Sequence, residues 1–138
     1  MIALEFWLRI ASLLTGVGAL LGAYGLISPV GVAGFFGLKL APGGEPYGAV
    51  RGVFGGVLLM HAASFTALAE APKIGACLAA AVGAAWLGQA AGRAVAALLE
   101  RSVGGRQLAI IAAEAAAGVG LWAPLWLYLK LIRQGSPV

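Results

Sequence analysis

Residues 10–38 read IASLLTGVGALLGAYGLISPVGVAGFFGL, a run of 29 residues without a charged side chain. A transmembrane helix needs about 20 predominantly apolar residues, so this run is too long for a single untilted crossing. Ser28 and Pro29 divide it, because a proline inside a helix removes a backbone hydrogen bond. We therefore predict a first span over residues 5–27 and a short interfacial or re-entrant segment over residues 30–38.

The composition of the whole chain places it in a lipid bilayer. Of its 138 residues, 62% are apolar and 10% are charged, and the mean hydropathy is +0.97. A soluble domain carries about a quarter charged residues, so a water-soluble globule is excluded. The formal charge of +4 comes from Lys and Arg residues scattered between apolar runs, which form no basic face for nucleic acid. The expected class is a single all-α membrane domain over residues 1–138.

Three further apolar stretches predict spans over residues 47–69, 74–99 and 107–129. Turn-forming residues separate the spans: Pro42, Gly43, Gly44 and Pro46, then the turn Glu70–Lys73, then Gly104 and Gly105. Because the turn at Glu70–Lys73 is short, the second and third spans should be antiparallel neighbours. Four crossings give a four-transmembrane-helix bundle with both termini on the same side. Lys and Arg residues are spread almost evenly over the two sides, which leaves the orientation open.

Three charged residues fall inside the predicted spans at a similar depth. Arg51 lies about one turn into the second span, Glu114 about two turns into the fourth, and Arg93 about two turns before the end of the third. A charge at the centre of a span costs about 2.5–3.5 kcal/mol, so we expect the three side chains to pair inside the bundle. Gln89 lies one turn from Arg93 on the same face and adds hydrogen-bonding groups. Two arginines and one glutamate leave a local charge of about +1, and such a cluster either binds an anion or merely locks three helices together.

Three other residues are candidates for the wall of a cavity: His61, Trp86 and Tyr47. His61 is the only histidine, and no second histidine or carboxylate at helical spacing completes a metal site, so neither a metal nor a cofactor is expected. Both a hydrogen-bonded packing histidine and a proton relay fit this residue. Trp86 shares a face with Arg93 and is either bundle filler or a stacking platform. No nucleophile–base arrangement indicates catalysis.

Small residues recur at the spacing that lets helix backbones approach in lipid. The pairs are Gly18 and Gly22, Gly52 and Gly56, and Gly88 and Gly92. We expect them to mediate tight packing within the chain. The alternative is a homodimer formed through the glycine-rich faces.

Several of these motifs together resemble a known family. They are Leu8-Arg9, Ser28-Pro29, Arg51-Gly52-Val53-Phe54-Gly55-Gly56, Gly92-Arg93 and Glu114, in this order along nearly the whole chain. In this respect the chain is similar to a domain-of-unknown-function family of small bacterial four-helix membrane proteins, broadly DoxX-like. The resemblance implies a bundle in the bacterial inner membrane, gives weight to the three intramembrane charges, and supplies no activity or substrate. The family pattern has an acidic residue before glycine in the loop after Gly92-Arg93, and residues 100–105 depart from it.

The function that these features favour is non-covalent binding of an amphipathic or anionic small molecule, or of a lipid, at the Arg/Glu cluster. One alternative is a proton-coupled small transporter or channel in which Glu114 titrates. A second is a non-catalytic accessory or assembly subunit of a membrane complex. A membrane enzyme would require His61, Glu114 and a substrate within reach of proton transfer.

Overall fold

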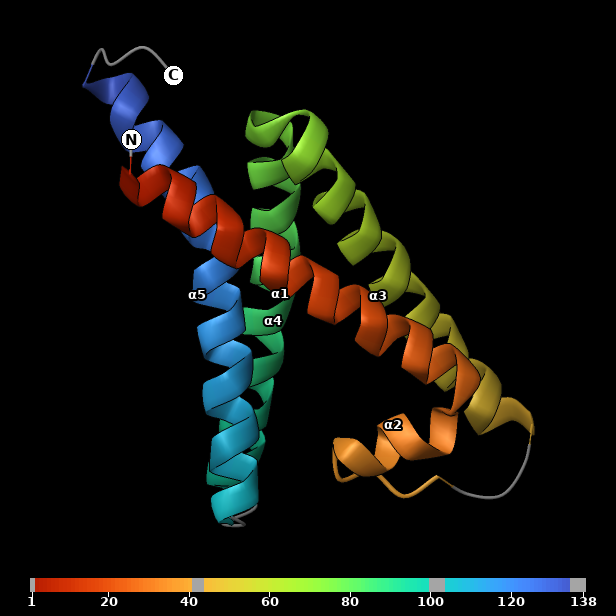
Figure 1. The fold of residues 1–138 in the computed structure, drawn as a ribbon. Helices are drawn as coiled ribbons and strands as arrows, with labels where there is room; N and C mark the ends of the chain where they lie inside the picture. The colour runs from red at the N-terminus through yellow and green to blue at the C-terminus, as the bar shows by residue number, and fades with distance from the viewer. Residues whose placement is uncertain (1, 41–43, 100–103, 135–138) are drawn as a thin grey trace.

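The computed structural model of the chain describes residues 2–40, 44–99 and 104–134. Within these residues the fold is entirely helical (Figure 1), with the helices α1 (Ile2–Ile27), α2 (Pro29–Phe35), α3 (Gly44–Glu70), α4 (Pro72–Leu99) and α5 (Gly105–Arg133). By length and composition, α1, α3, α4 and α5 are each able to cross a membrane. The chain is therefore a multi-pass membrane protein with an all-α, four-helix architecture, as the sequence predicts.

Each predicted span corresponds to one long helix, and α2 lies within the segment predicted over residues 30–38 apart from its first residue, Pro29. The predicted loop before α3 needs a correction, because Gly44 and Pro46 already belong to the first turn of that helix. Proline is tolerated there, since the first N–H groups of a helix have no intrahelical partner. Pro42 and Gly43 lie outside the described residues, as do residues 100–103 of the loop before α5.

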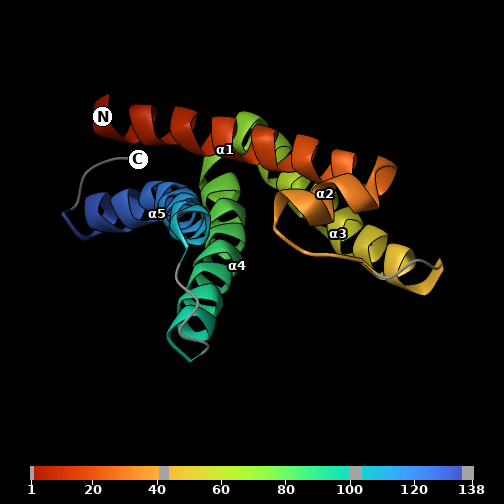
Figure 2. The same cartoon turned by 90° about the horizontal axis from the view of Figure 1, so that it is seen from below.

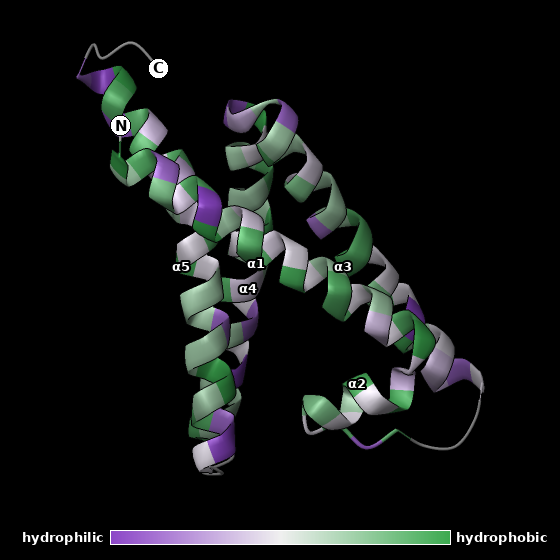
Figure 3. Ribbon diagram, viewed as in Figure 1, coloured by the Kyte–Doolittle hydropathy of each residue, from purple (hydrophilic) through white to green (hydrophobic). Residues whose placement is uncertain are grey.

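The long helices pack as two pairs, α1 with α3 and α4 with α5, which are joined by the tight turn between α3 and α4. In Figure 1, α3 and α4 meet at this turn and diverge toward their other ends, and α2 lies at the open end of the wedge. The view from below shows α2 alongside α1 and α3 (Figure 2), the two long helices that it contacts. No contact joins α3 to α5 in the described parts of the chain. Apolar residues run along the long helices, and hydrophilic residues gather mainly near their ends (Figure 3).

Glycines bring the helices of each pair into backbone contact. A Cβ atom at Gly18 of α1 would overlap the ring of His61, and one at Gly22 would overlap the backbone of α3. In the other pair, a Cβ atom on Gly83 would lie 2.8 Å from the carbonyl oxygen of Gly118. Lipid supplies no hydrophobic force between helices, so this close packing is what holds each pair together.

The other two glycine pairs correct the prediction of tight internal packing. Gly52 and Gly56 on α3, and Gly88 and Gly92 on α4, have no atom of another helix within 4 Å of the place where a Cβ would stand. All four glycines are exposed, so they mediate no close approach between helices of this chain. A homodimer through the exposed glycines stays a prediction.

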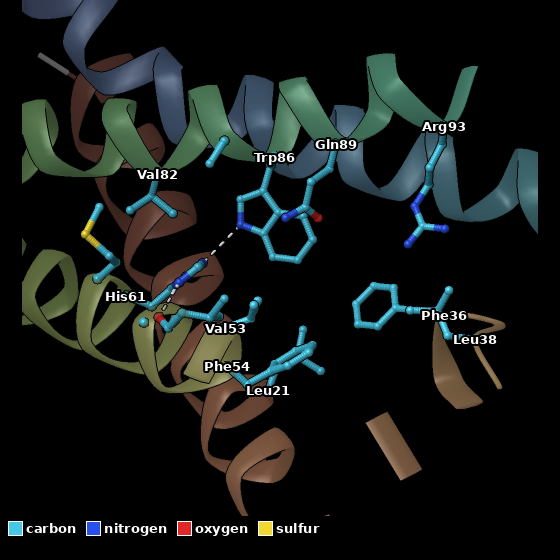
Figure 4. Close-up of a pocket in the computed structure, with 14 residues that line it drawn as sticks. Leu21, Phe36, Leu38, Val53, Phe54, His61, Val82, Trp86, Gln89 and Arg93 are labelled. Atoms are coloured by element: carbon cyan, nitrogen blue, oxygen red, sulfur yellow. Dashed lines mark hydrogen bonds between the residues drawn. The ribbon is translucent and has the colours of Figure 1, made fainter. Parts of the chain in front are cut away.

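A Schellman motif ends α2 and sets the direction of the chain after it. Gly37 has a φ of +78°, its N–H donates to the Gly34 carbonyl over 3.1 Å, and the N–H of Leu38 donates to the Ala33 carbonyl over 2.8 Å. This pattern closes the last turn and requires a left-handed residue, for which glycine has no steric cost. The motif turns Phe36 and Leu38 toward the opening between α3 and α4 (Figure 4).

Candidate functional site

A crevice of about 320 Å³ lies between α3 and α4 (Figure 4). Its walls include Leu21 of α1, a run of α3 from Val53 to His61, and a run of α4 from Val82 to Arg93; Phe36 and Leu38 border one end. The crevice opens sideways between the two helices, since the lining residues Val53 and Met60 are 64% and 51% exposed. Its volume lies at the lower end of the range for small-molecule pockets, about 300–1,000 Å³.

The polar end of the crevice is built on Arg93. Its Nε donates to Oε1 of Glu114 over 2.9 Å, and its guanidinium carbon lies 5.4 Å from the centre of the Phe36 ring. The two terminal nitrogens of Arg93 point into the crevice (Figure 4) and have no hydrogen-bond partner among the described residues. The amide of Gln89 projects toward the same opening, between Trp86 and Arg93. This end of the crevice therefore presents several unused N–H donors.

Glu114 forms an ion pair with Arg93 but does not itself line the crevice. Its side chain belongs to α5 and is 2% exposed, whereas the side chain of Arg93 is 28% exposed. The second carboxylate oxygen, Oε2, is buried without a hydrogen-bond partner among the described residues. The sequence correctly predicts that these two charges meet, and the reason is that α4 and α5 are consecutive helices packed along their lengths.

The opposite end of the crevice is formed by His61 and Trp86. The indole Nε1 donates to Nε2 of His61 over 3.0 Å, and Nδ1 of the imidazole lies 2.8 Å from the Val57 carbonyl. Because an indole can only donate and a carbonyl can only accept, the imidazole must be the neutral tautomer that carries its proton on Nδ1. Both ring nitrogens are therefore engaged, and the histidine, 3% exposed, is a hydrogen-bonded packing residue. This end offers a ligand mainly apolar surface.

Arg51 and Tyr47 lie elsewhere, which corrects the predicted cluster and cavity wall. Arg51 is exposed, and its Nε donates to the Leu26 carbonyl in the last turn of α1 over 3.1 Å. The final carbonyls of a helix lack intrahelical partners, so a neighbouring arginine is a favourable cap. Glu114 is out of its reach because α3 does not pack against α5. Tyr47 is half-buried and lies outside the residues that line the crevice.

Two contributors to the site are not predicted from the sequence. Phe36 borders the crevice and stacks with the Arg93 guanidinium. Arg106, at the start of α5, donates from one terminal nitrogen to the Gly34 and Phe35 carbonyls, each over 2.9 Å, and so caps α2. The position of Phe36 could have been inferred from the sequence Phe36-Gly37-Leu38, since glycine just after a short helix is typical of a Schellman motif. Nothing in the sequence near Arg106 indicates its contact with the end of α2.

The described residues hold no group of three or more His, Cys, Asp and Glu side chains able to bind a metal ion. The geometry defines a multi-pass helical membrane protein with a lateral crevice that is apolar along most of its length and rich in hydrogen-bond donors at one end. No family model, no curated protein and no solved structure matches the chain.

Proposed function

We propose that this chain binds an amphipathic small molecule without covalent chemistry, in the crevice between α3 and α4. The observation that carries the proposal is the unequal polarity of the crevice. Arg93 and Gln89 offer unused N–H donors at one end, whereas the polar groups of His61 and Trp86 at the other end are already hydrogen-bonded. Ligand pockets typically combine an apolar body with a few convergent polar groups. The headgroup would lie at Arg93 and the apolar part would extend toward Trp86.

The dimensions suit a single headgroup with a medium-length apolar body. Trp86 and Arg93 are seven residues apart on α4, which is about 10 Å along the helix axis. We place the protein in the bacterial inner membrane, as the family resemblance implies. We also place both termini on the same side, a proposal supported by the start of α1 and the end of α5 lying at the same end of the bundle (Figure 1).

Native mass spectrometry with a pair of glycine variants tests the proposal. Gly56 lines the crevice and Gly52 lies one turn away outside it, and at both positions no atom of another helix would lie within 4 Å of an added Cβ. Gly56→Leu should therefore fill the crevice, and Gly52→Leu is the matched control. Gently extracted wild type and Gly52→Leu should carry an adduct of reproducible mass that Gly56→Leu lacks. An adduct retained by Gly56→Leu, or none on the wild type, would contradict binding in the crevice.

A second candidate function, proton-coupled transport, is supported by Oε2 of Glu114, which is buried without a partner among the described residues. A carboxylate inside a membrane domain is a common element of proton relays. The test is proton uptake into liposomes that contain the protein and a pH-sensitive dye. Proton uptake that is lost in Glu114→Gln would favour transport. If liposomes with the wild-type protein take up protons no faster than protein-free liposomes, proton transport is excluded.

A further inference from the structure

The polar end of the crevice has no net charge. Arg93 contributes one positive charge and Glu114 one negative charge, and the two are joined over 2.9 Å. Arg51 and Arg106 are not among the residues that line the crevice, and their guanidinium groups donate to carbonyl groups of α1 and α2. Among the described residues that line the crevice, Arg93 is the one charged side chain, and Glu114 balances its charge. The excess of one positive charge that the sequence predicts does not form, because Arg51 lies elsewhere.

We propose that the crevice selects an uncharged headgroup that accepts hydrogen bonds, such as a carbonyl group, over an anionic one, and that Glu114 sets this selectivity. The inference rests on the proposed binding function and names the class of ligand. The free groups of Arg93 and Gln89 are mostly N–H donors, which suits an acceptor. A carbonyl group would leave the site neutral.

An anionic headgroup meets an electrostatic penalty at this place. It would share Arg93 with Glu114, and the three groups together would carry one net negative charge within a membrane-spanning segment. An uncompensated charge at such a depth is costly. Glu114 cannot move away to water, since its side chain on α5 is 2% exposed. We therefore expect an anion to bind at least about tenfold more weakly than an uncharged acceptor of the same length.

Removal of the negative charge should reverse the preference. In Glu114→Gln, Arg93 keeps its charge and loses its counter-ion, so a bound carboxylate would neutralise the site. The variant retains a side chain of nearly the same size and a group able to accept from Nε. The same crevice would then bind a carboxylate more tightly than a ketone.

The test uses two bromine-tipped probes of equal carbon number, decanoate and the corresponding methyl ketone. Bromine quenches indole fluorescence at short range, and the tail of a bound probe would lie against Trp86. Replacing Trp7, Trp122 and Trp126 by Phe leaves Trp86 as the only reporter. The titrations are made in uncharged micelles at a pH where decanoate is ionised. Gly56→Leu in the same background measures the quenching that comes from partitioning alone.

In the wild-type reporter we expect crevice-specific quenching by the ketone at a concentration at least about tenfold lower than by decanoate, and the opposite order in Glu114→Gln. A wild type that prefers decanoate overturns the inference without any variant, and an unchanged order in folded Glu114→Gln overturns the role of Glu114. If neither probe quenches more than in Gly56→Leu, the proposed function itself fails. The ester carbonyl of a phospholipid shares the ketone's chemistry, and it is the occupant if added phosphatidylcholine displaces the ketone.

Discussion

The two residues of the Arg93–Glu114 ion pair should differ in how much their neutralisation lowers the free energy of unfolding. Arg93→Gln leaves a carboxylate that is 2% exposed without its counter-ion, whereas Glu114→Gln leaves a guanidinium that is 28% exposed at the edge of the crevice. A lone buried charge costs about 3–5 kcal/mol. The guanidinium can instead be solvated where it stands, because it is already partly exposed at the edge of the crevice. We expect Arg93→Gln to lower the free energy of unfolding by about 3 kcal/mol and Glu114→Gln by about 1 kcal/mol.

The double variant, which combines Arg93→Gln with Glu114→Gln, distinguishes the interaction between the two charges from the loss of each side chain alone. With both charges removed, no uncompensated charge remains at this site, so the loss should be smaller than in Arg93→Gln alone. The assay is reversible unfolding in mixed micelles of increasing SDS content, followed by circular dichroism. The pair Glu5–Arg9, joined over 2.6 Å but exposed on both partners, is the control and should change little when neutralised. If Glu114→Gln cost as much as Arg93→Gln, or if the two losses added up in the double variant, the reasoning would be refuted.

Three further predictions concern packing and the end of α2. Gly18→Ala should lower the free energy of unfolding by about 1–3 kcal/mol, because the methyl group meets His61, while Gly52→Ala should not; equal values in SDS titrations would contradict the close approach. Gly37→Ala should cost about 1–2 kcal/mol by the same assay, since its φ is +78°, and a neutral result would argue against the Schellman motif. Arg106→Met should speed amide hydrogen exchange in α2 but not in α4, which mass spectrometry would detect; unchanged exchange would exclude the cap.

The sequence predicts the helices well because membrane spans obey a simple constraint. Every backbone group inside a bilayer must be paired within the protein, so long apolar runs become helices and breaks fall where proline and glycine gather. The break at Ser28-Pro29 is an example, since α1 ends at Ile27 and Pro29 begins α2. The helix α3 begins earlier than the sequence predicts because Pro46 signals either a loop or a first helical turn, and the sequence does not distinguish the two.

The charged cluster is only half predictable from the sequence, and the error has a physical origin. Counting residues from the helix ends gives the depth of a side chain in the membrane, but it does not say which helices are neighbours. Arg93 and Glu114 lie on consecutive helices that pack together, so their similar depth is enough to predict that they pair. Arg51 lies on α3, which packs against α1 and α4 but not against α5. Its partner is a carbonyl at the end of α1, and this contact depends on helix arrangement.

The surroundings of the crevice explain why its polar end would decide what binds. In water an open apolar crevice would tend to close, but lipid chains are as apolar as its walls, so exposing Val53 and Met60 to a bilayer costs little. For the same reason an acyl chain would occupy the crevice when no ligand is present. A ligand's apolar body would then replace lipid by something equally apolar and gain little free energy. In the proposed binding mode, discrimination would therefore come from Arg93 and Gln89, and the negative charge of Glu114 beside Arg93 would be the main determinant of the ligand's headgroup.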